Sequence, residues 1–185
     1  MLYTRKGDKG DTHFFGCDQR FSKTSERAEA LGGVDEINSL IGVCKIKVGE
    51  MDLRLKKKNL FLRDLLGRVQ EDLFIIQANL AGSDKKISKE KISYLESVID
   101  EIEKQMPPIK TFFLAGGSEE SALFDYARAV ARKAERNVIN LNEKAKSSVD
   151  SLVLSYLNRL SSFLYALARF YNFKMDIKEK PPLYQ

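Results

Sequence analysis

The sequence predicts an all-α protein that folds as a bundle of five helices. Apolar residues recur at spacings of three and four along most of its 185 residues, which is the period of an amphipathic helix. No segment shows the sustained alternation of apolar and polar residues that marks a half-buried strand. The four prolines form two pairs, at 107–108 and 181–182, so they separate segments instead of interrupting them. Long helices joined by short connections bury their apolar faces against one another, which favours a bundle.

The first two helices are expected at 25–48 and 57–80. Thr24 or Ser25 is a suitable N-cap for the first helix, because a hydroxyl can accept from a free backbone N–H of the first turn. The core-facing positions of the first helix are predicted to be Ala28, Leu31, Asp35, Ile41 and Val48. Those of the second helix are predicted to be Leu60, Leu65, Val69, Leu73, Ile76 and Leu80.

The remaining helices are expected at 88–105, 118–141 and 147–172. The fourth helix follows the break at Gly116-Gly117, and it opens with serines and acids that suit a helix N-terminus. The fifth has the most regular apolar stripe in the chain. Its members are Val149, Val153, Tyr156, Leu160, Phe163, Leu167 and Tyr171.

The chain is expected to form one domain over residues 1–185, since this length suits a single core. Within it we distinguish a loop segment at 1–24, which is rich in glycine and polar residues, the helical bundle at 25–174, and a Lys/Pro tail at 175–185. The N-terminus lacks the apolar stretch of a secretory signal, and no apolar run approaches the ~20 residues that span a bilayer. We therefore expect a cytoplasmic protein without a membrane partner.

Charge and cysteine content exclude several classes of protein. The net charge is +5, but 31 basic residues stand against 26 acidic ones, so the chain is not a basic nucleic-acid-binding tail. Cys17 and Cys44 are too few for a disulfide framework or a CxxC metal site. His13 is the sole histidine, which makes a Ser-His-Asp triad or a histidine-ligated metal improbable.

Three arginines, Arg128, Arg132 and Arg136, recur every fourth residue and therefore share one face of the fourth helix. Guanidiniums placed so close together repel one another, yet their planar forks match phosphate oxygens. The stripe can be a solvated basic edge or a polyanion site. The N-terminal segment TRKGDKGDT favours the second interpretation, because glycines and cations together can form an anion-binding loop, although it is not a P-loop.

Two further positions combine polar or aromatic character with an unexpected place in the pattern. Asp35 falls on the predicted buried side of the first helix, where a carboxylate needs a partner such as Arg128 or Arg132. The alternative is that Asp35 is exposed near the helix start. Phe112 and Phe113 are adjacent on the connection before the fourth helix, where both cannot easily enter the same core. One of them can project into a ligand site, and packing under the loop is the commoner alternative.

Four blocks of the sequence together resemble the PduO-type corrinoid adenosyltransferases. They are YTRKGDKGDT at the N-terminus, RAEALGGVDEINSLIG at 27–42, FFLAGGSEESALFDYARAVARKAER at 112–136 and YLNRLSSFLYALAR at 156–169. The resemblance implies a five-helix bundle of the ferritin-like up-and-down type, with an N-terminal phosphate-binding loop. It also implies a homotrimer with its active site between neighbouring subunits.

The activity implied by the resemblance is transfer of the 5′-deoxyadenosyl group of ATP to cob(I)alamin, with Mg²⁺ carried by ATP and cobalamin as the second substrate. The corrinoid side of the site is implied to include Asp35 and Arg128, as a salt-bridged pair at the subunit junction, and Phe112 at the lower face of the corrin. Arg132 is implied to be catalytic as well as ATP-binding. The residues implied to bind ATP are Thr4, Arg5, Lys6, Gly7, Thr12, His13, Lys23, Arg132, Lys133, Glu135, Arg136 and Asn158.

Cob(II)alamin, a reductase and an enzyme that uses adenosylcobalamin are the further partners that such an activity implies. A non-catalytic module that binds ATP or delivers cobalamin is an alternative with the same nucleotide site. A nucleic-acid or membrane-surface binder is the weakest alternative, because basic and acidic residues nearly balance.

Overall fold

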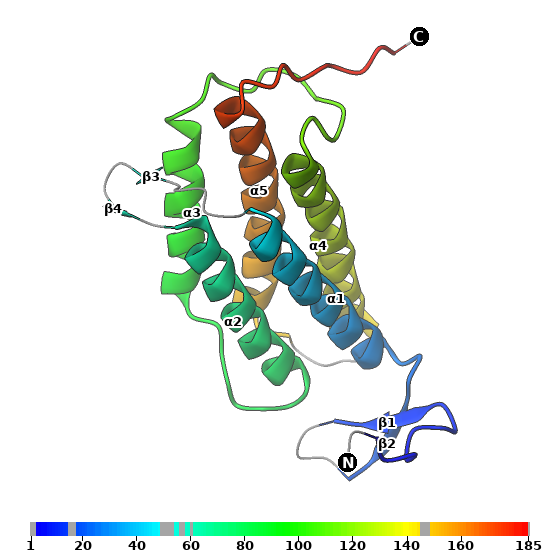
Figure 1. The fold of residues 1–185 in the computed structure, drawn as a ribbon. Helices are drawn as coiled ribbons and strands as arrows, with labels where there is room; N and C mark the ends of the chain where they lie inside the picture. Colours follow the sequence, from blue (N-terminus) through cyan, green and yellow to red (C-terminus); the bar gives the residue numbers. More distant parts are fainter. Residues whose placement is uncertain are drawn as a thin grey trace.

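The computed structural model describes residues 3–14, 18–48, 54–55, 58–59, 61–144 and 149–184, and it confirms the five-helix bundle (Figure 1). Consecutive helices run in opposite directions, as in an up-and-down bundle. Helix α1 packs against α2 and α4, and α5 packs against α3 and α4, so α4 joins the two halves of the bundle. The helices are α1 Glu26–Lys47, α2 Leu62–Leu80, α3 Lys89–Glu103, α4 Glu119–Lys144 and α5 Ser151–Lys174.

Two short antiparallel hairpins accompany the helices, and the sequence pattern did not predict them. Strands β1 (Asp11–His13) and β2 (Arg20–Ser22) pair near the N-terminus, and β3 (Arg54–Leu55) pairs with β4 (Lys58–Asn59). Strands of two or three residues are too short to show a period of two. The predicted start of the second helix at 57 is wrong, because β4 precedes it and α2 begins at Leu62. The predicted inward residue at position 60 lies outside the described residues.

The apolar stripe of α5 is confirmed as the centre of the core. Six of its seven predicted members are buried, and Val149 is partly buried. Helix α5 is contacted on two sides, by α3 and α4, so a wide arc of its surface leaves water. Full burial of a side chain such as Phe163 contributes roughly 1.5–3 kcal/mol through removal of apolar surface from water. Among the described residues, no helix is both long and apolar enough to cross a membrane.

The predicted phase of α1 is partly wrong. Ile41 and Val48 are buried as expected, but Asp35 is exposed, so the alternative interpretation of that carboxylate is the correct one. Helix α1 packs against α2 on one side and α4 on the other, which buries a broad arc that no single stripe describes. Its buried residues are Ala30, Gly33, Val34, Ile37, Asn38, Ile41 and Cys44.

The predicted helix starts are confirmed for α1 and α4 by capping interactions. The Ser25 hydroxyl accepts from the Ala28 N–H at 3.4 Å, and the Ser118 hydroxyl accepts from the Ser121 N–H at 3.1 Å. Just before α4, Gly116 and Gly117 have φ of 111° and 113°, a backbone conformation that side chains disfavour. The two glycines therefore let the chain turn sharply into α4 at the end of the bundle where the C-terminal tail also lies (Figure 1).

Candidate functional site

A cavity of about 830 Å³ lies between the α3–α4 connection, α4 and α5. Phe112, Arg128 and Arg132, all singled out from the sequence, line it, together with apolar side chains such as Met106. Burial raises the pKa of the Tyr165 phenol in the same wall, so the phenol keeps its proton and can donate a hydrogen bond. Apolar walls with guanidiniums on one side suit a large ligand that carries both apolar surface and negative charge.

The two adjacent aromatics of the α3–α4 connection have different environments. Phe112 is 75% exposed at the cavity, whereas Phe113 is partly buried, with the Arg169 guanidinium 5.9 Å from its ring centroid. The backbone next to them is held by the tail, because the Leu114 N–H donates to the Lys180 carbonyl at 2.9 Å. Both rings line the cavity, and Phe112 is the more exposed of the two.

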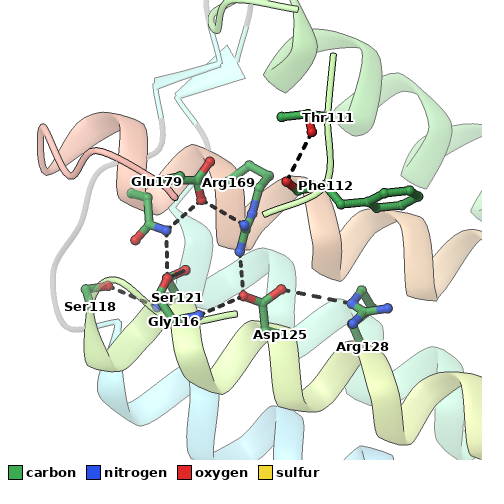
Figure 2. Close-up of polar contacts among 10 residues, drawn as sticks. Thr111, Phe112, Gly116, Ser118, Ser121, Asp125, Arg128, Arg169 and Glu179 are labelled. Carbon is green, nitrogen blue, oxygen red and sulfur yellow. Dashed lines mark hydrogen bonds and ion pairs between the residues drawn. The ribbon is translucent and has the colours of Figure 1, made fainter. Parts of the chain in front are cut away.

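A buried group of charges lies directly behind this connection (Figure 2). The Arg169 guanidinium, 2% exposed, forms ion pairs with Asp125 of α4 and, at 2.8 Å, with Glu179 of the tail. Asp125 also accepts from the Gly116 N–H at 3.2 Å, and its second oxygen lies 4.0 Å from Nε of Arg128. Asp125 thus stands between two arginines, one in the core and one at the cavity.

Sequence reasoning missed Asp125, Arg169 and Glu179. A signal was present for Arg169, since it is a charged residue within the otherwise apolar run FLYALARFYNF of α5. A charge in such a run is expected to be buried and therefore paired. Its partners are 44 residues away in α4 and 10 residues away in the tail, and the apolar period predicts neither pairing.

Asp35 and Arg128 do not pair within one chain. The nearest described partner of Asp35 is Gln77 of α2, whose amide lies 3.5 Å from the carboxylate, and the ionic neighbour of Arg128 is Asp125. Asp35 is exposed and Arg128 is about one-third exposed, so both side chains remain accessible from outside. A pair between them across a subunit junction stays a prediction.

The rest of the basic face of α4 is organised by contacts with neighbouring helices. Lys133 forms an ion pair with Glu36 of α1 at 2.9 Å, and this hydrogen bond raises the pKa of Lys133. Glu135 accepts from the Asn158 amide at 2.9 Å, which links α4 to α5. Arg132 and Arg136 are exposed. The structure thus brings the predicted nucleotide-binding residues of α4 and α5 onto one accessible surface.

The N-terminal loop is held in a defined shape by the first hairpin. Lys23 donates to the Gly7 carbonyl at 2.8 Å, and a Cβ at Gly7 would lie 3.0 Å from the Lys23 ammonium. Arg20 of β2 binds both oxygens of Asp11 at 2.6 Å and also donates to the Lys6 carbonyl. The hydrogen bond from Arg20 lowers the pKa of Asp11, so the ion pair between Arg20 and Asp11 is charged at neutral pH.

The other predicted residues of this segment lie in the same loop and strand. Arg5 adopts a left-handed conformation with φ of 59°, and Thr4 accepts from the Lys6 N–H at 3.4 Å. Thr12 and His13 belong to β1. The structure therefore brings the predicted N-terminal residues together with Lys23.

The N-terminal hairpin lies at one end of the bundle, and the α3–α4 connection, which lines the cavity, lies at the other (Figure 1). Helix α4 begins at the cavity end and runs toward the hairpin end, where the Asn137 amide donates to the Glu29 carbonyl of α1 at 3.3 Å. The arginine stripe follows the same path from Arg128 to Arg136. One chain therefore presents the two predicted parts of the site at the two ends of a continuous basic face.

No group of three or more His, Cys, Asp or Glu side chains in the described part of the chain is arranged to hold a metal ion. The oxygen donors near the predicted phosphate site, such as Glu135, are already engaged in hydrogen bonds. These residues fit an ion that arrives on a phosphate ligand better than one held by a protein cage.

Comparison with known proteins connects this arrangement to one family. A family model described as cobalamin adenosyltransferase matches residues 2–171. The corrinoid adenosyltransferase PduO of Citrobacter freundii is 39% identical over 175 residues, which cover 91% of this chain and 49% of that relative. The corrinoid adenosyltransferase of Bacillus subtilis is 36% identical over 184 residues, which cover 95% of this chain and 89% of that relative. The chain thus spans about half the length of the PduO relative.

Solved structures give the same result for the fold. A variant of the PduO-type ATP:corrinoid adenosyltransferase from Lactobacillus reuteri, complexed with cobalamin and ATP, matches with a TM-score of 0.89 at 28% identity. The match covers 100% of this chain and 97% of that chain. Another variant of that enzyme, complexed with ATP, matches with a TM-score of 0.84 at 28% identity, over 98% of this chain and 100% of that chain. Sequence and structure agree over most of the chain, which therefore belongs to the cobalamin adenosyltransferase family.

Proposed function

We propose that the chain transfers the 5′-deoxyadenosyl group of ATP to the cobalt of cob(I)alamin, forming adenosylcobalamin and releasing triphosphate. The observation that carries this proposal is the cavity lined by Phe112 and Arg128, from which the basic face of α4 continues through Arg132 to Arg136. Such a site offers an apolar face to one ligand and guanidiniums to the phosphates of another. The related proteins are corrinoid adenosyltransferases, and one of them was solved with cobalamin and ATP, which supports the same pair of ligands.

The reaction needs positioning and charge neutralisation more than proton transfer. Cobalt(I) supplies an electron pair to the ribose 5′ carbon, the Co–C bond forms, and the C5′–O bond breaks. The triphosphate leaves with the electron pair of the broken C5′–O bond. Since no proton moves in this step, the chain needs no general base, which suits a protein whose sole histidine is His13. Holding the reacting atoms in line and stabilising the leaving group then account for the catalysis.

The triphosphate is proposed to lie along the accessible surface of α4 and α5. Arg132 and Arg136 supply exposed guanidiniums, and Lys133 keeps two N–H donors beyond the one that it gives to Glu36. The amide of Asn158 donates to Glu135 and accepts from Arg159, and we propose that Asn158 contacts the nucleotide. Mg²⁺ is proposed to arrive with ATP, where it neutralises phosphate charge.

The N-terminal loop is proposed to bind phosphate as well. Its ordered turn places Lys6, Gly7 and Lys23 together, and the residues proposed to contact ATP there are Thr4, Arg5, Lys6, Gly7, Thr12, His13 and Lys23. Because this loop and the α3–α4 connection, which lines the cavity, lie at opposite ends of the bundle, we propose that neighbouring subunits of a homotrimer complete each site. The exposed Asp35 of one subunit would then pair with Arg128 of the next. Sedimentation equilibrium of the wild type tests the trimer, which a monomeric result would exclude.

Phe112 is proposed to occupy the lower face of the corrin. Its exposed apolar ring would exclude an axial ligand, which favours four-coordinate cob(II)alamin and so makes reduction to cob(I)alamin easier. A reductase, a downstream enzyme that uses adenosylcobalamin and a cytoplasmic location remain predictions that follow from this proposal.

Anaerobic turnover tests the proposed function directly. Protein, ATP, Mg²⁺ and chemically reduced cobalamin are mixed, and formation of the Co–C bond is followed by absorbance while the phosphate products are separated. We expect adenosylcobalamin and triphosphate in equal amounts, and a loss of at least tenfold in kcat/KM for ATP in Arg132→Ala. Arg63→Ala, which removes an exposed arginine from α2, is the matched control. Release of orthophosphate or ADP would refute the mechanism, and ATP binding without product would favour a non-catalytic module.

A further inference from the structure

We propose that Asp125, Arg169 and Glu179 form a positioning network through which the C-terminal tail sets the place of the Phe112 loop and of Arg128. We call these three residues the charge network; Asp125 and Arg169 are buried, and Glu179 is partly buried. The inference rests on the proposed function, because it assigns to the network a part in the corrinoid half of that reaction. None of the three residues is itself proposed to touch a substrate.

The C-terminal tail is attached to the bundle at defined points. The Ile177 N–H donates to the Asn172 carbonyl at 2.9 Å, which turns the tail back over the end of α5. Glu179 accepts from Arg169 at 2.8 Å and from the Asn172 amide at 2.7 Å. The next tail residue, Lys180, accepts from the Leu114 N–H. The tail therefore bridges α5 and the connection that carries Phe112.

The network also binds the connection that carries Phe112. Gly116 donates its N–H to Asp125 and accepts from the Ser121 hydroxyl at 3.0 Å and the Asn172 amide at 2.9 Å. Arg169 also lies against the ring of Phe113. The backbone at 114 and 116 and the Phe113 ring thus hold the connection directly after Phe112. The exposed ring of Phe112 has little packing of its own, so these anchors set its position.

Along the network the signs of the charges alternate, from Glu179 to Arg169 to Asp125 to Arg128 (Figure 2). Removing a buried member leaves its neighbour with an uncompensated charge in a region of low polarity, which is costly. Loss of Glu179 leaves Arg169 with Asp125 alone, which draws Asp125 toward the core and away from Arg128. The buried Nε atoms of Arg128 and Arg169 lack a hydrogen-bond partner in the described structure. A small shift of Asp125 therefore changes which of the two arginines it binds.

Glu179→Gln is the sharpest variant, because it removes the charge but keeps an oxygen that can accept from the Asn172 amide. Asp176→Asn is the matched control, since it makes the same chemical change on an exposed residue of the same tail. Asp176 has φ of 53°, a conformation that asparagine tolerates, so the control should not disturb the backbone. Thermal unfolding of both variants is measured first to show that each is folded.

Hydrogen–deuterium exchange of the protein without substrates tests the anchoring. We expect the Leu114 and Gly116 amides to exchange at least tenfold faster in Glu179→Gln than in the wild type, with no change in Asp176→Asn. Exchange at wild-type rates in Glu179→Gln would overturn the proposed link between the tail and the loop. This measurement needs no turnover, so it stands even if the wild type proves to make no adenosylcobalamin.

Turnover from two starting states tests the consequence for the reaction. Starting from cob(II)alamin and a reductant, we expect Glu179→Gln to lose about tenfold in rate and to show a weaker electron paramagnetic resonance signal of four-coordinate cobalt. Starting from cob(I)alamin, we expect a loss of less than threefold and an unchanged KM for ATP. Equal losses from both states would overturn the positioning role and leave a general structural effect.

Discussion

The turn into α4 offers a test with two neighbouring glycines that share a backbone conformation but differ in what an added Cβ would meet. Gly116 and Gly117 have nearly the same φ, so an alanine at either position pays a similar cost of backbone strain, roughly 1–3 kcal/mol. A Cβ at Gly116 would meet nothing within 4 Å. A Cβ at Gly117 would lie 2.7–2.9 Å from the side-chain atoms of Asn172, which real contacts do not allow.

The magnitude of the difference follows from what Asn172 holds. Its amide donates to the Gly116 carbonyl and to the Glu179 carboxylate, and Asn172 is fully buried. A neutral hydrogen bond contributes about 1 kcal/mol and one to a charged group about 1.5–3 kcal/mol. We therefore expect Gly117→Ala to lower the free energy of unfolding by about 2–4 kcal/mol more than Gly116→Ala does.

Urea denaturation followed by circular dichroism measures both variants against the wild type. The slope of free energy against urea concentration must stay constant for the comparison to hold. If the two variants are destabilised equally, within about 0.5 kcal/mol, then the contact with Asn172 does not constrain this turn, and the account of how the connection is anchored fails.

Three further predictions concern charge, packing and reactivity. Arg128→Ala should raise the KM for cobalamin, and Arg132→Ala should raise the KM for ATP, each by roughly 10–100-fold, the range for one charge-assisted hydrogen bond. Steady-state kinetics with each substrate varied in turn measures both constants. An increase of the same KM in both variants would contradict this division. Gly32→Ala should stabilise α1 by up to about 1 kcal/mol, because a Cβ there meets nothing within 4 Å. Gly33→Ala should destabilise the protein, because its Cβ would lie 3.3 Å from a backbone atom of α4. The same urea denaturation would contradict this if both variants changed the free energy of unfolding in the same direction. Burial raises the pKa of Cys44 to about 11, so at pH 8 its thiol is both protonated and inaccessible. After maleimide treatment, mass spectrometry should find the Cys44 peptide modified in urea but not in the native protein. Modification of the Cys44 peptide in the native protein within minutes would contradict this burial.

The helices could be predicted from the sequence where a regular apolar stripe marks the buried side. Helix α5 shows this, because its stripe from Val153 to Tyr171 is regular even though the helix packs against both α3 and α4. Helix α1 shows the limit. It packs on two sides, and small residues such as Gly33 allow close approach to α4, so its pattern gave no single phase and misplaced Asp35.

Some residues of the candidate site could likewise be predicted from the sequence, and others could not. Local chemistry singled out Phe112 and the arginines of α4, because their spacing within one helix or loop is visible in the sequence. The partnership of Arg169 with Asp125 depends on how α5 packs against α4, and it has no local signal. The hairpin that shapes the N-terminal loop was missed because its three-residue strands are too short to show a period of two, and because the contacts that join them, Arg20 with Asp11 and the ring of Phe14 with that of Phe21, are not local in the sequence.

The continuity of α4 sets a fixed length between the two ends of its basic face. An α-helix rises 1.5 Å per residue, so the eight residues from Arg128 to Arg136 separate their backbones by about 12 Å along the axis. Loops at either end can adjust when ligands bind, but this spacing cannot change without breaking backbone hydrogen bonds. Inserting or deleting a single residue between the two arginines would also rotate one of them by about 100° around the axis, because there are 3.6 residues per turn. Between Arg128 and Arg136, function should therefore constrain the number of intervening residues as well as the identity of the two arginines.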